Sequence, residues 1–266
     1  MPFTLAHPAA VLPLVRRPFV ASALVAGAVA PDVLYVGPVY RFATQGISGN
    51  LTLTLTHKFT SAFWLDPLLG LLLLVVFNLV IKRPLLALAP VPLAGRLPSP
   101  RAPLRLPSLS VLLWTLVSVV VGALTHVLWD SFTHGDGYFV RRFPDFFRAE
   151  VTAAWDVNRI LQYVSTVGGC VVLAWWLYHW YRRTNPRPVT PGDQVPAWVR
   201  YVVLTAVVLL AAAGAVIELG RAEGGFTGET AVRLALTGFA SGGLAALSWY
   251  VVLWHAARLR RGVAAL

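Results

Sequence analysis

Cysteine and charge are both scarce in this chain. Of its 266 residues only 12% are charged and 57% are hydrophobic, and the single cysteine, Cys170, lies within an apolar run. One thiol excludes an internal disulfide framework and a cysteine-based zinc site. A mean hydropathy of +0.68 is far above that of a soluble domain, so we expect the chain to be embedded in a lipid bilayer.

Acidic residues are half as numerous as basic ones, 11 against 22, which gives a net charge of +11. Such an excess can indicate a nucleic-acid-binding protein. Here the basic residues stand between apolar runs, as they do in the loops of membrane proteins. We therefore expect no nucleic-acid partner.

Five apolar runs are long enough to cross a bilayer, which takes roughly 20 residues. The sequence therefore predicts an all-α, polytopic membrane protein. Its predicted organisation is a membrane domain over residues 1–180, a cytoplasmic linker over 181–200 and two additional transmembrane helices over 201–266. The predicted spans are residues 63–81, 108–128, 157–180, 198–219 and 233–256.

The loops between these runs alternate in charge. The 82–107 loop, the 181–200 linker and the C-terminus are basic, whereas almost every acid lies near 31–62, 129–156 or 220–232. The positive-inside rule then places the basic loops and the C-terminus in the cytoplasm. The acidic loops fall on the outer side of the membrane.

The first 30 residues allow two interpretations. Arg16-Arg17 followed by the apolar run 19–30 could be a signal peptide, although Pro31 would follow the cut. The interpretation we favour is a hairpin of two short helices, over about 5–15 and 19–30. Each arm would be about 16 Å long at 1.5 Å per residue, too short to cross the bilayer. An antiparallel hairpin would bring His7 beside Asp32.

A stretch rich in metal-ligand residue types follows the second predicted span. His126, Asp130 and His134 recur at intervals of four, so on a helix they point from one face on successive turns. Ionisable side chains at the end of a membrane helix are costly and usually mark a functional site. His126 and Asp130 are spaced as two residues that share one cation, although a His–Asp hydrogen bond gives the same pattern. His134 would join them from the helix or from the glycine-rich turn that follows.

Three further candidates lie at the predicted outer ends of other segments. His57 precedes the first span, Asp32 follows the 19–30 run, and His7 opens the chain. Each has an ordinary alternative: an interfacial histidine, a turn aspartate and a solvated terminal histidine. Their convergence on one face, through a topology assigned from Lys and Arg alone, favours a metal site. The predicted ligands are His7, Asp32, His57, His126, Asp130 and His134.

Imidazole and carboxylate ligands together suit a divalent cation, zinc or manganese in preference to calcium. A cation of this kind lowers the pKa of bound water and polarises a phosphoryl or acyl oxygen, which is hydrolytic chemistry. Asp130 and Asp32 are the predicted catalytic residues, each as a ligand or a general base.

Several motifs of this chain occur in the same order in a known family. By them the chain resembles domain-of-unknown-function family 4184, a group of uncharacterised bacterial membrane proteins, over roughly residues 1–180. The motifs are Met1-Pro-Phe-Thr-Leu-Ala-His7, Ala30-Pro-Asp32, His57, Phe63-Trp-Leu-Asp66-Pro-Leu-Leu-Gly70 and His126-x-x-x-Asp130-x-x-Thr133-His134.

That family is similar in motif order to the predicted membrane-bound metal-dependent hydrolases of the inner membrane. Those share a distant His, Asp, His, His-x-x-x-Asp succession with zinc-dependent phospholipase C. The resemblance implies that five residues ligate a metal, with His134 as an additional ligand. The five are His7, Asp32, His57, His126 and Asp130. Lys58 departs from the pattern, since a small residue commonly follows the histidine, and the late His and Glu ligands of phospholipase C have no identified counterpart.

We therefore expect an integral-membrane, metal-dependent hydrolase in the bacterial inner membrane. Its expected substrate is a phosphoester, a membrane lipid or lipid-linked compound, reached at the extracytoplasmic face. Two alternatives stay open. One is a non-enzymatic membrane protein with a structural metal site or polar network. The other is a small ion-coupled transporter that uses the same His and Asp side chains as a cation path.

Overall fold

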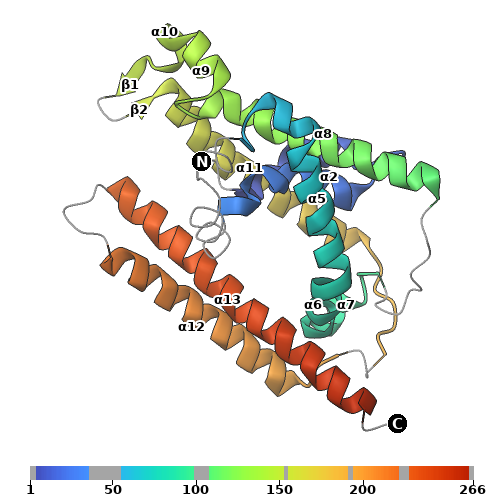
Figure 1. The fold of residues 1–266 in the computed structure, drawn as a ribbon. Coiled ribbons are helices and arrows are strands. Elements are labelled where there is room, and N and C mark those ends of the chain that lie inside the picture. Colours follow the sequence, from blue (N-terminus) through green and yellow to red (C-terminus); the bar gives the residue numbers. More distant parts are fainter. Residues whose placement is uncertain are drawn as a thin grey trace. The chain divides into compact units, whose positions relative to one another are not determined.

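The computed structural model describes residues 4–35, 55–98, 108–152, 155–190, 194–221 and 228–263. The described chain is almost wholly helical (Figure 1). Five stretches are long and apolar enough to cross a membrane, which confirms the polytopic all-α fold. They are Leu65–Leu88, Leu109–Arg142, Val157–Arg183, Ala197–Gly220 and Thr230–Arg260.

The chain divides into two compact units. The first contains residues 1–76 and 103–184, and the second contains residues 77–102 and 185–266. All six predicted ligands belong to the first unit. Most of the 31–62 loop and residues 99–107 of the basic loop lie outside the described residues.

The N-terminal segment of the first unit has two short helical arms, as the hairpin interpretation predicted. They cover residues 4–14 and 21–34 and are too short to cross a bilayer. Buried Val11, Leu24 and Ala28 hold the arms together. The elements are η1 (Thr4–Ala6), α1 (Pro8–Val11), η2 (Leu12–Leu14), α2 (Ala21–Val29) and η3 (Ala30–Tyr35).

Helix α2 lies directly against α8 (Leu109–Thr133), the long helix of the first unit (Figure 1). The backbones approach closely because glycines stand at the crossing: a Cβ on Gly27 or Gly122 would collide with the partner's backbone. The N–H of Val20, the N-cap residue of α2, donates to Ser118 Oγ of α8 at 2.9 Å. A short helix buried in a membrane protein needs such partners, because no water satisfies its backbone.

The remaining elements of the first unit pack around the C-terminal part of α8. Helix α5 (Leu65–Val76) follows the turn η4 (Phe59–Phe63) and packs on α2 and α8. After α8 come α9 (Tyr138–Arg142), α10 (Pro144–Phe147) and the antiparallel pair β1 (Glu150–Thr152) and β2 (Trp155–Asp156). Helix α11 (Val157–Arg183) begins at the capping residue Asp156, whose carboxylate accepts from Arg159 N at 3.2 Å.

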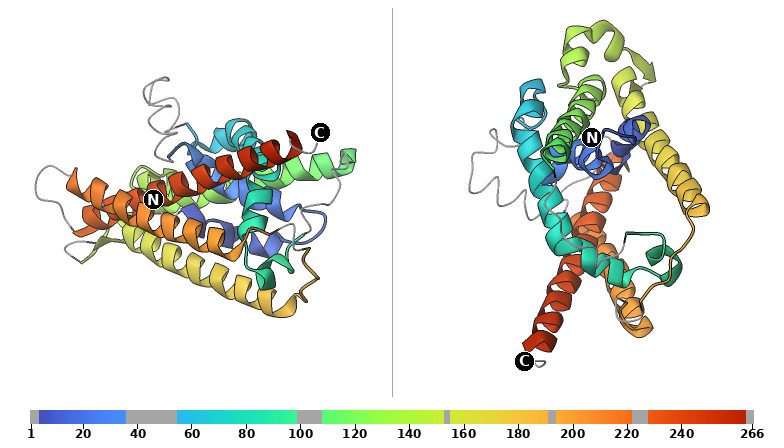
Figure 2. Two further views of the ribbon diagram at one scale, coloured as in Figure 1. Left: turned by 90° about the horizontal axis from the view of Figure 1, so that it is seen from below. Right: turned by 90° about the vertical axis from the view of Figure 1, so that its right-hand side faces the viewer.

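The second unit is built on the helix pair α12 (Ala197–Gly220) and α13 (Gly228–Val263), which run side by side in Figure 1 and in the left view of Figure 2. Arg200 donates to the carbonyls of Leu88 and Ala89 at the end of α6. An apolar cavity of about 850 Å³, lined in part by Trp198 and Trp254, lies in this unit. Its other elements are the π-helical turn η5 (Phe77–Ile81), α6 (Lys82–Leu88) and α7 (Val91–Ala94).

Candidate metal centre

His126 lies on the buried face of α8 and has no solvent-exposed surface. Its Nδ1 is 2.7 Å from the carbonyl oxygen of Ala28 in α2. A carbonyl only accepts hydrogen bonds, so Nδ1 carries the proton and Nε2 presents its lone pair to the interior. This arrangement, one ring nitrogen held by the backbone and the other free to coordinate, is typical of metal-binding histidines.

Asp130 lies one turn beyond His126 on the same face, as its i, i+4 spacing predicted. Its carboxylate is nearly fully buried and is surrounded by imidazoles. Oδ2 is 3.3 Å from Nε2 of His126 and 3.4 Å from Nε2 of His57. Oδ1 is 3.5 Å from Nε2 of His7. The two oxygens therefore face histidines from three different segments.

The N-terminal hairpin contributes His7 and Asp32, and both are buried. Asp32 Oδ2 accepts from Thr4 Oγ1 at 2.6 Å, while Oδ1 is 3.7 Å from His126 Nε2. The ring of His7 stacks on the ring of His126 with centroids 3.7 Å apart and an interplanar angle of 15°. Burial, together with the neighbouring His126, lowers the pKa of His7 to about 4, so this imidazole is neutral at pH 7 and able to coordinate.

His57 reaches the same point from the segment before η4. Its Nε2 is 3.3 Å from Asp32 Oδ1 and 3.4 Å from Asp130 Oδ2, and its Nδ1 lies 3.1 Å from Thr56 Oγ1. Burial disfavours protonation of this ring, but interaction with the Asp130 and Asp32 carboxylates outweighs burial and raises its pKa to about 10. Without a metal, the cation between these carboxylates is therefore the protonated His57 itself.

His134 lies at the edge of the cluster. Helix α8 ends at Thr133, so His134 is the C-cap residue and enters from the turn, the second of its two predicted routes. Its Nδ1 is 3.2 Å from the Asp130 carbonyl oxygen and 3.5 Å from Asp130 Oδ2. The structure thus places His134 against Asp130, but outside both of the ligand triads described next.

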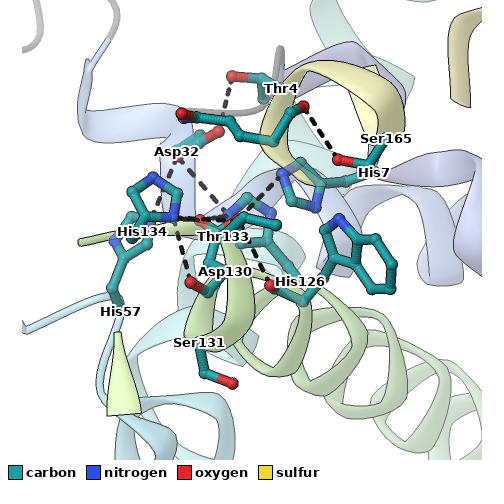
Figure 3. A network of polar contacts seen from close by, with 12 residues as sticks. Thr4, His7, Asp32, His57, His126, Asp130, Ser131, Thr133, His134 and Ser165 are labelled. Carbon is teal, nitrogen blue, oxygen red and sulfur yellow. Dashed lines mark hydrogen bonds and ion pairs between the residues drawn. The ribbon is translucent and has the colours of Figure 1, made fainter. Parts of the chain in front are cut away.

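The ligand atoms form two overlapping triads in which all atoms lie within 4.8 Å of one another. One is His7, Asp32 and His126, and the other is His57, His126 and Asp130. Figure 3 shows the six side chains pointing toward one another from α8, the N-terminal hairpin and the His57 segment. The structure thus brings the six predicted residues together.

The separations between the ligand atoms are compatible with a metal site. Nitrogen–oxygen pairs in the cluster are 3.3–3.7 Å apart, longer than the roughly 2.7–3.2 Å of ordinary N–H···O hydrogen bonds. Ligands at about 2.1 Å from one tetrahedral zinc lie about 3.4 Å apart. Buried ligand atoms also lack hydrogen-bond partners among the described residues: His7 Nε2, Asp32 Oδ1, His126 Nε2 and both carboxylate oxygens of Asp130. The residues therefore fit a divalent cation.

Asp66 is a buried acid that was not among the predicted site residues. It is fully buried in the first turn of α5, and its Oδ2 is 2.8 Å from Ser61 Oγ. Ser61 Oγ is also 2.7 Å from the carbonyl oxygen of Lys58, the residue after His57. The sequence does contain a sign of this residue. Asp66 stands in Phe63-Trp-Leu-Asp66-Pro, at the start of an apolar run where a carboxylate is costly.

Comparisons with known proteins give one match. No curated protein and no solved structure matches the chain. The model of a family described as Domain of unknown function (DUF4184) matches residues 1–252, which extends through most of α13 and beyond the residues that carry the sequence motifs. The match covers far more than half of the chain, and the chain therefore belongs to family DUF4184.

Proposed function

We propose that this protein is an integral-membrane, metal-dependent hydrolase of a phosphoester. The observation that carries the proposal is the pair of ligand triads that share His126, whose Nε2 is directed into the cluster by the Ala28 carbonyl. Buried imidazole and carboxylate atoms at metal-ligand separations are costly unless a cation holds them.

Zinc or manganese suits this set of nitrogen and oxygen ligands. His126 and Asp130 hold one side of the site, while His7, Asp32 and His57 close it from other segments. A bound divalent cation supplies Lewis-acid activation of water and of a phosphoryl oxygen. Asp32 and Asp130 are the carboxylates at hand to orient the attacking water and take its proton, and Thr4 holds Asp32 in place for this role.

A lipid or lipid-linked phosphoester is the proposed substrate, reached from the outer leaflet of a bacterial inner membrane. The site lies at the end of the spanning helix α8, where a headgroup and not an acyl chain would meet it. The charge of the loops supports a cytoplasmic C-terminus. The motif order, similar to that of predicted membrane-bound metal-dependent hydrolases and of zinc-dependent phospholipase C, supports the chemistry.

A structural metal site is the second candidate, and the burial of the cluster favours it. Structural sites are closed by protein ligands, whereas catalytic sites keep an open position. His126, Asp32, Asp130 and His7 are all at most 5% exposed. The side chains of His57 and His134 are about one fifth exposed, 19% and 20%. These two side chains lie on the side from which a substrate would approach. Their exposure supports the hydrolase over the structural metal site.

Metal analysis of the purified protein, followed by a hydrolysis assay, tests the proposal. We expect stoichiometric zinc or manganese in the wild type, and cleavage of a generic phosphodiester in detergent micelles. Asp130→Asn should abolish cleavage while the protein stays folded by thermal denaturation. Metal without cleavage of phosphodiesters or phosphomonoesters would assign the cluster to a structural role, and a wild type that binds no metal would eliminate both.

The orientation is tested separately with reporters fused at residue 266. A reporter active only in the cytoplasm should be active there, and one active only outside should be silent. The opposite result would move the site to the cytoplasmic face and exclude outer-leaflet substrates.

A further inference from the structure

The segment between α8 and α11 exposes several large apolar side chains. We call residues 138–152 and 155–156, which contain α9, α10, β1 and β2, the collar. It forms the tip of the first unit beyond the end of α8 (Figure 1). Its exposed apolar residues are Tyr138 at 63%, Phe143 at 52%, Phe146 at 62%, Val151 at 58% and Trp155 at 39%.

The opposite side of the collar is packed firmly on the helix that carries the metal ligands. Val140 and Phe147 are buried. Phe139 stacks on Phe132 of α8 with ring centroids 4.2 Å apart and an interplanar angle of 4°. Arg148 donates to the carbonyl of Gly135, one residue beyond His134, at 3.0 Å. The exposed aromatic residues therefore belong to an ordered element whose position is coupled to that of Asp130 and His134.

The chain itself limits where the collar can lie. It lies between α8 and the membrane span Val157–Arg183. Helix α8 has 25 residues, more than the roughly 20 that cross the hydrocarbon core. We therefore expect the C-terminal end of α8, and the collar after it, to lie at the membrane–water interface. Aromatic side chains are enriched at that depth, because their rings are apolar and their polar groups stay hydrated.

The charges of the collar fit the same layer. Three arginines and three acids are interspersed along the segment, and Arg142 lies over the ring of Phe143 at 5.5 Å. Equal numbers of both signs match the paired charges of zwitterionic headgroups and give no preference for an anionic surface. The charged residues are Arg141, Arg142, Arg148, Asp145, Glu150 and Asp156.

We propose that the collar is a monotopic membrane-binding element that lies in the headgroup layer of the leaflet adjoining the metal-ligand cluster. Its aromatic side chains enter the boundary between headgroups and acyl chains, to a depth of roughly 5–10 Å. Because the collar is packed on the end of α8, it fixes the depth of the cluster in the same layer. This inference rests on the proposed function: if the cluster is the hydrolase site, its position in the headgroup layer indicates that the substrate is a phosphoester held in the bilayer.

Depth-dependent fluorescence quenching in vesicles tests the collar directly. Cys170→Ser provides a cysteine-free full-length background. Phe146→Cys and Tyr138→Cys, each labelled with an environment-sensitive fluorophore, report on the apolar side of the collar. Asp145→Cys, next to Phe146 in α10, is the matched control. The vesicles contain zwitterionic phosphatidylcholine with a nitroxide quencher on the upper acyl chain, and iodide is the aqueous quencher.

We expect labels at 146 and 138 to emit at shorter wavelength and to be quenched more by the lipid nitroxide than by iodide. The label at 145 should show the reverse order. The proposal is overturned if the labels at 146 and 138 are quenched by iodide as strongly as the label at 145. It is also overturned if both are shielded from both quenchers, because a protein partner or second copy would then cover them. The readout needs no metal and no turnover, so it can fail while the metal proposal stands.

Discussion

Two helix pairs in this protein pack in the same way but bury different chemistry. In the first unit, α2 and α8 meet at Gly27 and Gly122, and in the second, α12 and α13 meet at Gly214 and Gly238. In both pairs a Cβ on either glycine would collide with backbone of the partner. Close approach of small residues is a general way for membrane helices to associate. It is therefore not by itself a sign of a site.

The difference lies in what the close approach brings together. At the first pair it places the Ala28 carbonyl 2.7 Å from His126 Nδ1. Around the second pair the neighbouring cavity is apolar and aromatic. Apart from Tyr250, every buried polar or charged side chain among the described residues lies in the first unit. Polar burial and tight packing are thus separate properties here, and only the first unit combines them.

Removing the shared ligand should give the largest contrast between the units. His126→Ala should abolish stoichiometric metal binding, because His126 belongs to both triads. His255→Ala is the matched control in α13, where Nε2 of the half-buried His255 lies 2.9 Å from the Val80 carbonyl oxygen. Metal content by atomic emission should fall to background in the first variant and stay at the wild-type value in the second. Full metal content in His126→Ala would contradict the assigned triads.

Adding one methyl group to each helix pair compares the packing directly. Gly122→Ala and Gly238→Ala should each destabilise the protein by about 1–3 kcal/mol through overpacking. Only Gly122→Ala displaces the backbone of α2 near Ala28, and it should weaken zinc binding by roughly 10–100-fold. Thermal denaturation and zinc titration measure the two effects. Equal losses of zinc affinity in both variants would show that metal binding depends on general stability and not on this contact.

The comparison also explains what could be predicted from the sequence. The five spans were confirmed to within a few residues at most ends because long apolar runs in a bilayer have few alternatives to a helix. The largest differences are at two C-terminal ends. The first span extends to Leu88 instead of the predicted residue 81, and the second extends to Arg142 instead of residue 128. The His126–Asp130 face followed from helical periodicity. Convergence with His7, Asp32 and His57 was predicted through topology, and the structure brings them together.

Other features of the site leave no periodic pattern in the sequence. The contacts of Ala28 and Thr56 with the histidine rings depend on how segments distant in the sequence pack, or on local turn geometry. The sequence does not determine that α8 ends at Thr133, because His134 can continue a helix or cap it. The pair β1–β2 was not predicted, since its strands have only three and two residues.

Zinc affinity should depend on pH through His57. The pKa of His57 is raised to about 10 in the metal-free protein, so the ring is protonated at pH 7. Coordination needs its lone pair, and binding therefore releases this proton. The apparent affinity should rise about tenfold per pH unit between pH 6 and 8 and fall as pH decreases.

Titration calorimetry in buffers of different ionisation enthalpy measures the number of protons released. The control is His57→Gln, which should bind zinc more weakly and release about one proton fewer. If wild type and control release the same number of protons, His57 is not the group displaced by the metal.

The smallest expected change in zinc affinity concerns Asp66. The expectation rests on the single hydroxyl proton of Ser61, which has two possible acceptors. The hydroxyl of Ser61 lies within hydrogen-bonding distance of both Asp66 Oδ2 and the Lys58 carbonyl oxygen, but it has one proton to donate. A carbonyl cannot donate, so both contacts are satisfied when Asp66 is protonated and donates to Ser61, which donates to Lys58. The chain of bonds would then fix the backbone next to His57 without placing a charge in the apolar interior.

Asp66→Asn keeps a neutral donor at this position and should change zinc affinity by less than about twofold. Ser61→Ala removes the link to Lys58 and should weaken zinc binding by about tenfold, as the loss of an outer-shell partner does. Zinc titration of the two variants at constant pH measures the difference. If Asp66→Asn is instead the more damaging change, Asp66 acts as an ionised group, and its charge contributes to holding the cation in the first unit.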